Sequence, residues 1–238
     1  MSIGVPQVPF NISTKQSEWI EVYDLFYTQR LIVLCQDIDN EITNHISALF
    51  LYLNTITIRD FGYKTKENMA KYPRLFFYIN SMGGHISSAL AIYDVMGMME
   101  SEITTLCMGV SAGSATLLLT KGQTRIGLIH SRIMMSQPTS AGIDGPATNL
   151  EIEVKQMNKY IDIMSSIYAK RTMRPRLGIL NDMKREYFFS AREAKQYGLI
   201  DGVANDNDPE NEKVMFGWTF NPKYRIQVDD GFLLNSTI

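Results

Sequence analysis

The chain has 238 residues, of which 45% are hydrophobic and 20% charged, the composition of an ordinary globular domain with a sizeable core. Its formal net charge of −2 provides no excess of basic groups for nucleic acid or an anionic membrane surface. No apolar run approaches the roughly 18 residues of a membrane-spanning helix, and the start MSIGVPQVPF resembles neither a secretory signal nor an Arg/Ser-rich import leader.

The first third of the chain predicts an arm followed by two helices and a strand. Residues 1–16 are rich in loop formers and predict an extended arm. Residues 17–29 predict an amphipathic helix with Ser17 as its N-cap, and residues 30–38 a short buried strand. Apolar residues near a 3.6 period predict a helix over 40–53. The polar stretch that follows, 54–74, predicts a surface excursion.

The middle of the chain repeats one plan of strand, glycine turn and helix. Residues 75–79 predict a buried strand, the run NSMGGH a turn, and residues 86–99 an apolar helix. Residues 103–122 repeat the plan, and residues 126–135 predict another strand. Strands that alternate with helices in this way predict an α/β fold with mostly parallel pairing.

The segment that most suggests chemistry is ITTLCMGVSAGSATLLLTKG, residues 103–122. Its small residues predict a tight turn between a buried strand and a helix, where a substrate could approach the backbone. Free N–H groups at the start of the helix could hold an oxyanion, and a serine at the turn would be a candidate nucleophile. Close packing of the helix on the strand would favour the same small residues, so the pattern leaves both interpretations open.

The last third predicts a loop, a long helix, a short helix and a tail. A Gly/Pro/Ser/Thr loop spans 137–149, and a helix over 150–171 has one charged face and one apolar, methionine-bearing face, suited to core packing or to a subunit contact. Ser190 and Glu193 predict the start of a further helix, which Gly198 ends. Residues 205–238 begin with a polar run and predict a tail.

Cysteine and histidine usage points away from disulfides and metals. Cys35 and Cys107 stand in separate apolar runs, and we expect both to be reduced core thiols. His45, His85 and His130 form no Cys/His pattern with the spacing of metal ligands, so no metal site is expected.

Several motifs occur in an order and spacing that resemble one family. They are IGVPQVPF, FFYINSMGG followed by ALAIYDVM, TTLCMG, RIMMSQP and YFFSAREAKQYGLID, and together they cover about residues 3–203. The chain resembles the proteolytic subunits of the ATP-dependent Clp protease. The opening IGVPQVPF is most similar to the plastid-encoded members, which implies the plastid stroma, with the bacterial cytoplasm as the alternative.

The resemblance implies an architecture and a set of partners. The fold would be the α/β spiral of strand-strand-helix repeats shared with the crotonases, with a long protruding helix. Residues 1–16 would form an axial arm, 17–204 the Clp-protease-like domain with an insertion at about 54–74, and 205–238 a C-terminal extension. Two seven-membered rings, here of mixed subunits, would meet through residues 137–171. An AAA+ unfoldase would use ATP and deliver unfolded proteins, and this chain would bind no cofactor.

The family cleaves peptides with a Ser-His-Asp triad, and this sequence departs from it at each position. The nucleophile position is Gly113, the base position is Ser136, and the acid position is Glu186. Glycine cannot attack a carbonyl, and a serine hydroxyl cannot act as a base near neutral pH. Met82 replaces the proline of the oxyanion turn, whereas Gly83, Gly84 and the N–H of Ser114 stand at the oxyanion positions.

Three functions follow as hypotheses. In the first, the chain is a non-catalytic Clp core subunit, similar to the R-type subunits of mixed rings, that closes the ring, lines the chamber and shapes the docking face. In the second, Ser114 or Ser111 is a displaced nucleophile activated by His85, although a one-residue step turns a helical side chain by about 100°. In the third, the same fold carries a crotonase-like acyl-thioester reaction, for which no further motif is present.

Overall fold

The computed structural model describes residues 6–10, 18–63, 72–139 and 145–204. These residues form strands and helices that alternate over most of the chain. The strands are β1 (Gln7–Phe10), β2 (Glu18–Glu21), β3 (Leu31–Leu34), β4 (Leu75–Ser81), β5 (Ile103–Ala112), β6 (Thr124–Leu128), β7 (Arg132–Met135), β8 (Tyr187–Ser190) and β9 (Gly202–Ala204). The helices are α1 (Val22–Thr28), α2 (Asn40–Phe61), α3 (Ile86–Gly97), α4 (Ser114–Lys121), α5 (Ala147–Thr172), α6 (Arg176–Asp182) and α7 (Ala191–Tyr197).

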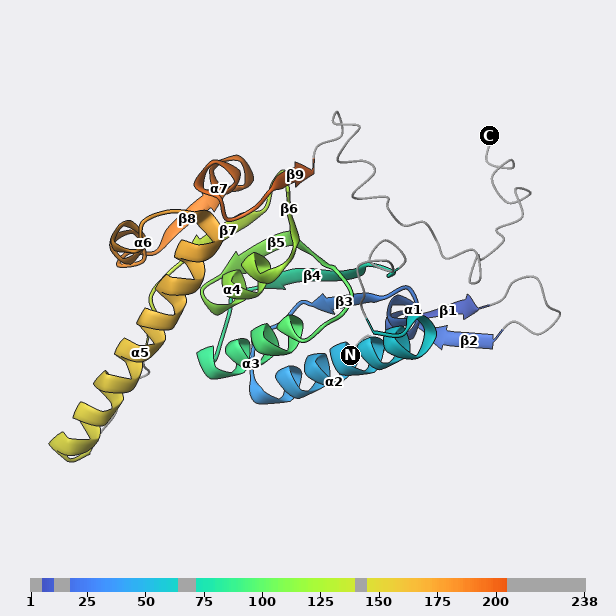
Figure 1. Cartoon of the computed structure of the whole chain (residues 1–238), viewed down its shortest axis with the longest axis horizontal. Helices are drawn as coiled ribbons and strands as arrows, with labels where there is room; N and C mark the ends of the chain where they lie inside the picture. Colours follow the sequence, from blue (N-terminus) through green and yellow to red (C-terminus); the bar gives the residue numbers. More distant parts are fainter. Residues whose placement is uncertain (1–5, 11–17, 64–71, 140–144, 205–238) are drawn as a thin grey trace.

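The main sheet is parallel along its length, in the order β3-β4-β5-β6-β9. The end of β5 leaves β6 and pairs in parallel with β7, which pairs in turn with β8 in antiparallel fashion. Helices α2 and α3 lie side by side beneath the sheet in Figure 1. The buried core contains side chains of α2, β4 and α3, among them Phe50, Phe77 and Ile92. The α/β fold class expected from the sequence is therefore confirmed.

The beginning of the chain differs from the prediction. Residues 7–10 form β1, which pairs with β2, so part of the expected arm belongs to a two-stranded sheet. The expected helix over 17–29 begins only at Val22, because the four residues before it are extended by pairing with β1, a contact between segments that the local sequence pattern does not reveal. Ser17, expected as its N-cap, lies outside the described residues.

Helix α2 is longer than predicted. It continues beyond residue 53 to Phe61, and Gly62, with a φ of 78°, follows it. The expected surface excursion over 54–74 is therefore wrong for its first eight residues, where Thr57 is fully buried and accepts a hydrogen bond from Arg30. Residues 64–71 lie outside the described part of the chain.

The segment 103–122 keeps its predicted order of strand, turn and helix, but the turn is a single residue. Strand β5 runs through most of the small residues up to Ala112, and α4 begins at Ser114. Gly113 alone connects them, because its neighbours on the strand still pair with β7. The single strand expected over 126–135 is two strands, β6 and β7, separated by a turn.

Helix α5 is confirmed as a long helix, and its first half extends away from the sheet (Figure 1). Its buried residues, Met164, Ser165, Tyr168 and Thr172, all lie in the second half. In the first half Ile152 and Val154 are 66% and 59% exposed, so an apolar surface of this helix is uncovered in the single chain. The sequence left two interpretations of this helix, core packing or a subunit contact. Because Val154 lies outside the core, core packing does not describe the first half of the helix.

The end of the described chain follows the prediction closely. Ser190 accepts a hydrogen bond from the Glu193 N–H, and the Glu193 carboxylate accepts one from the Ser190 N–H, which completes a capping box. Gly198 ends α7 with a φ of 98°. The predicted tail, 205–238, lies outside the described residues.

The two cysteines have different environments. Cys107 is buried, and burial raises the pKa of its thiol to about 11. Cys35 is exposed, so the expectation that it belongs to the core is wrong. It follows β3 at the point where the chain leaves the sheet, and an apolar run alone could not show that the strand ends one residue before it.

Candidate functional site

The register of three strands brings Gly113, Ser136 and Glu186 together. Ala112 pairs with Met134, so Gly113 comes directly after the paired end of β5, and its N–H donates to the Met134 carbonyl at 3.2 Å. Met135 pairs with Tyr187 in the last pair of the β7–β8 ladder, and Ser136 and Glu186 are the next residue along the chain on either side of that pair.

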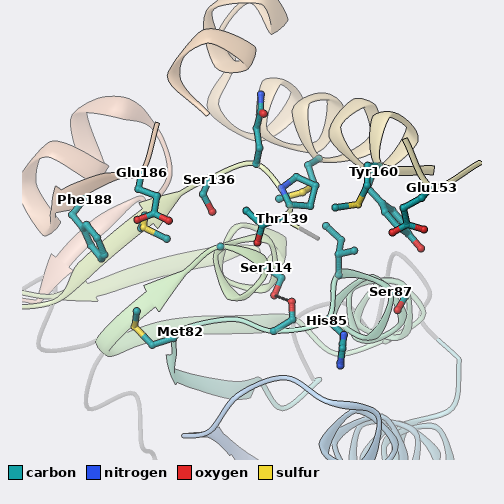
Figure 2. A pocket seen from close by; sticks show the side chains of 18 residues that line it. Met82, His85, Ser87, Ser114, Ser136, Thr139, Glu153, Tyr160, Glu186 and Phe188 are labelled. Atoms are coloured by element: carbon teal, nitrogen blue, oxygen red, sulfur yellow. Dashed lines mark hydrogen bonds between the residues drawn. The ribbon is translucent and has the colours of Figure 1, made fainter. Parts of the chain in front are cut away.

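These three residues line one cavity of about 620 Å³. Figure 2 shows Ser136 and Ser114 near its middle, Glu186 and Phe188 toward one end, and Glu153 and Tyr160 toward the other. The remaining lining comes from the β4–α3 turn, the end of β7 and helix α5: Met82, Gly84, His85, Ile86, Ser87, Met134, Gln137, Pro138, Thr139, Met157 and Met164. A cavity of this size is typical of sites that bind small molecules or short peptide segments.

The backbone at Gly113 has the conformation of a sharp strand-to-helix elbow. Its φ of 54° and ψ of −119° lie where residues other than glycine are rare. A Cβ atom placed on Gly113 would stand 3.6 Å from the Ser136 hydroxyl oxygen and 3.8 Å from the Met82 carbonyl oxygen, both ordinary contacts. The Gly113 carbonyl accepts the Thr116 N–H at 3.2 Å and the hydroxyl of buried Tyr168 at 3.4 Å. The elbow therefore has room for a side chain directed at Ser136.

Two backbone N–H groups beside the elbow are free. The Ile38 N–H donates to the Gly83 carbonyl, and the His85 N–H donates to the Ile38 carbonyl. Because successive groups of an extended backbone face opposite sides, the N–H of Gly84 between them faces away from Ile38. Neither it nor the N–H of Ser114 donates a hydrogen bond within the described chain.

These two N–H groups belong to residues that are in contact, since the Ser114 hydroxyl donates a hydrogen bond to the Gly84 carbonyl at 3.2 Å. The N–H of Gly83 donates instead to the Ser81 hydroxyl at 3.1 Å. A pair of free N–H groups of this kind can bind a carbonyl oxygen.

The serines expected as displaced nucleophiles differ in position. Ser114 lines the cavity but is only 6% exposed, and its hydroxyl proton is directed at the Gly84 carbonyl. Ser111 is fully buried in β5 and is not among the cavity-lining residues. Its hydroxyl oxygen has no hydrogen-bond partner among the described residues. Ser136 is half-buried, and within the same residues its hydroxyl makes no hydrogen bond.

The histidines provide no base for these serines. His85 precedes α3 and lines the cavity, but its exposed ring points away from Ser114 and Ser136 in Figure 2. His45 lies on the exposed surface of α2, 4.0 Å from Glu41, and His130 is exposed in the turn between β6 and β7. In the described chain no histidine makes a hydrogen bond to a serine, and this includes the pair of His85 with Ser114 or Ser111 that the displaced-nucleophile hypothesis requires.

The sequence analysis did not assign to the site the residues of α5 that cover the cavity. Glu153, Met157, Tyr160 and Met164 recur along α5 at intervals of three or four residues, which is the spacing of one helix face. The sequence shows that face, but the direction in which α5 returns to the sheet decides that it covers Gly113. Phe188 was missed for a similar reason, because the β7–β8 pairing places it opposite Met134.

The described residues contain no group of three or more His, Cys, Asp or Glu side chains arranged to hold a metal ion. Over the same residues, no helix combines the length and the apolar character needed to cross a membrane.

Comparison with known proteins shows the family of this chain. The Clp protease family matches residues 14–207, and the chain belongs to that family. An ATP-dependent Clp protease proteolytic subunit of Chaetosphaeridium globosum is 39% identical over 211 residues, which are 87% of this chain and 98% of the relative. Subunits of the same description from Marchantia polymorpha and Staurastrum punctulatum are 37% and 36% identical over 211 residues, with the same two shares of chain covered.

Proposed function

We propose that this chain is a non-catalytic subunit of a Clp protease core and acts in ATP-dependent protein degradation through assembly rather than peptide hydrolysis. The observation that supports this most directly is the cavity at Gly113, Ser136 and Glu186. The backbone elbow, the free N–H pair and the β7–β8 ladder give this site the form of a serine peptidase centre. The positions of the nucleophile and the base, however, carry no group able to perform either role.

The displaced-serine alternative has less support. A serine nucleophile needs a base within hydrogen-bond reach of its hydroxyl, about 2.6–3.2 Å. Ser114 instead donates to a carbonyl oxygen, which cannot take up its proton near neutral pH, and Ser111 is buried outside the cavity. The acyl-thioester hypothesis gains nothing from the cavity, because the shared fold is no evidence of a shared reaction.

The proposed role depends on assembly with other Clp proteolytic subunits in mixed seven-membered rings, two of which enclose a chamber. Helix α5 suits the contact between rings, because its exposed first half carries Ile152 and Val154 on a helix that extends away from the domain. The N-terminal segment, in which residues 7–10 form β1, belongs in this proposal at the axial pore, where an AAA+ unfoldase docks.

The proposal also includes location and cofactors. The relatives come from green algae and land plants, which supports a place in the plastid stroma. This chain binds no cofactor of its own, and ATP is consumed by the unfoldase.

The experiment that tests the proposal is fluorophosphonate labelling of the native assembled complex, followed by assignment of every labelled peptide to its subunit. The active partner subunits act as the internal positive control. We expect them to be labelled and this chain to remain unlabelled. A label on Ser114 or Ser111 of this chain would overturn the proposal and show that a base activates that serine in the assembly.

A further inference from the structure

The carboxylate of Glu186 is exposed in the cavity and has no partner. Within the described chain it makes no hydrogen bond and no ion pair. Ser136, which lines the same cavity, has a neutral side chain, so Glu186 has no imidazole there to orient. A carboxylate that is unpaired in a concave site, rather than on an open surface, is available to a ligand.

The carboxylates give the described lining of the cavity a negative charge. The second carboxylate, that of Glu153, is half-buried at the other end of the cavity and is also unpaired within the described residues (Figure 2). No lysine or arginine is among the described residues that line the cavity, and His85 directs its ring away from Ser136. Such a site favours a cationic group and disfavours a terminal carboxylate or a phosphate, because like charges would meet at close range.

The rest of the lining suits an extended polypeptide. The free N–H groups of Gly84 and Ser114 can hold one backbone carbonyl. Apolar side chains at the end near Glu186, those of Met82, Met134 and Phe188, can contact aliphatic or aromatic side chains, and methionine adapts to varied shapes. A peptide offers a carbonyl, apolar groups and, through lysine or arginine, a cation on a long aliphatic stem.

We propose, building on the non-catalytic function above, that this cavity binds an extended segment of an unfolded polypeptide without cleaving it, with a lysine or arginine side chain against Glu186. The backbone carbonyl of the bound segment accepts hydrogen bonds from the N–H groups of Gly84 and Ser114. The hydroxyls of Ser114 and Ser136 in the cavity have no base among the described residues to activate them, so the segment leaves intact. The chain thereby selects for basic sequence within the degradation chamber.

The test uses the native complex, with the serines of its active subunits blocked by diisopropyl fluorophosphate. The probes are two decapeptides with a photoreactive benzophenone residue, identical except for lysine or glutamate at the adjacent position. Cross-linked peptides are assigned to subunits by mass spectrometry, and the yield on this chain is followed against probe concentration. We expect cross-links near Met82 and Phe188, with the lysine probe reaching half-saturation at a concentration about 3- to 10-fold lower than the glutamate probe.

Two variants decide whether Glu186 is responsible. We expect Glu186→Gln to remove the preference for lysine, whereas Glu102→Gln should retain it. Glu102 is the matched control because it precedes the start of β5, at the opposite end of this strand from Gly113, and lies 3.6 Å from Arg74. Absence of cross-links to this chain, or a lysine preference that survives Glu186→Gln, would overturn the inference.

The two proposals fail in different ways. If this chain is unlabelled by fluorophosphonate and also binds no peptide, only the peptide-binding inference is wrong. If a serine of this chain is labelled by fluorophosphonate, the non-catalytic function is wrong and the inference falls with it.

Discussion

The conformation of Gly113 leads to a prediction about the substitution Gly113→Ser. A side chain fits there without a clash, since its Cβ would be 3.6 Å from the nearest atom of Ser136. The backbone, however, would hold a residue other than glycine at a φ of 54°, which costs about 1–3 kcal/mol. For a domain of this size, 1 kcal/mol lowers the midpoint of thermal unfolding by about 2–4 °C. We therefore expect a decrease of roughly 2–12 °C in the full-length chain.

The assay is thermal and urea unfolding of wild type, Gly113→Ser and Gly113→Ala. The alanine variant introduces the same Cβ without a hydroxyl, so it should be destabilised to the same extent. The slope of the unfolding free energy with urea should stay unchanged, because the folded chain buries the same surface. If Gly113→Ser is as stable as wild type, the idea that a side chain strains the backbone at position 113 is refuted.

Adding a histidine to the Gly113→Ser variant tests whether the site can support a reactive serine. The double variant G113S/S136H would place an imidazole in the same cavity as Glu186 and beside the new hydroxyl. We expect it to react with a fluorophosphonate about 10²- to 10⁴-fold faster than Gly113→Ser alone, the usual contribution of a positioned base. If the double variant folds and assembles but reacts no faster, positions 113, 136 and 186 do not have the geometry of a catalytic triad.

Further predictions concern the glycine turn at Gly84, the cap of α7 and one ion pair. Gly84→Ala should prevent stable folding, seen as loss of the near-ultraviolet circular dichroism signal, because its Cβ would lie within 2.2 Å of the Ile38 carbonyl oxygen. Ser190→Ala should lower the unfolding free energy by about 1 kcal/mol through loss of the α7 cap, measured with urea. Burial tends to raise the pKa of Asp201, but hydrogen bonds and charge from Arg125 outweigh it and hold that pKa below its ordinary value of 3.8. The stability from this pair is thus present above about pH 4 and lost as the pH falls further, and Asp201→Asn should flatten that part of the pH profile.

Local sequence determined much of the fold because the relevant forces act between near neighbours. The apolar strand over 75–79 and the helix over 86–99 follow from hydrophobic periodicity, and the cap at Ser190 follows from a reciprocal hydrogen bond over three residues. The predictions failed where distant segments meet. Residues 18–21 are extended by pairing with β1, and the buried Thr57 in α2 accepts a hydrogen bond from Arg30, 27 residues earlier.

For the site, the sequence by itself determined which residues stand at the three positions. A glycine at position 113 has no side chain to attack a carbonyl, and a serine hydroxyl at position 136 is a poor base near neutral pH, and these properties belong to the residues in any fold. Only the tertiary structure decided that the two positions share a cavity with Glu186, because strands far apart in sequence must pair in one register to bring them together. The same long-range pairing, together with the return of α5 to the sheet, places two carboxylates in that cavity without a partner among the described residues, a feature that sequence spacing does not contain.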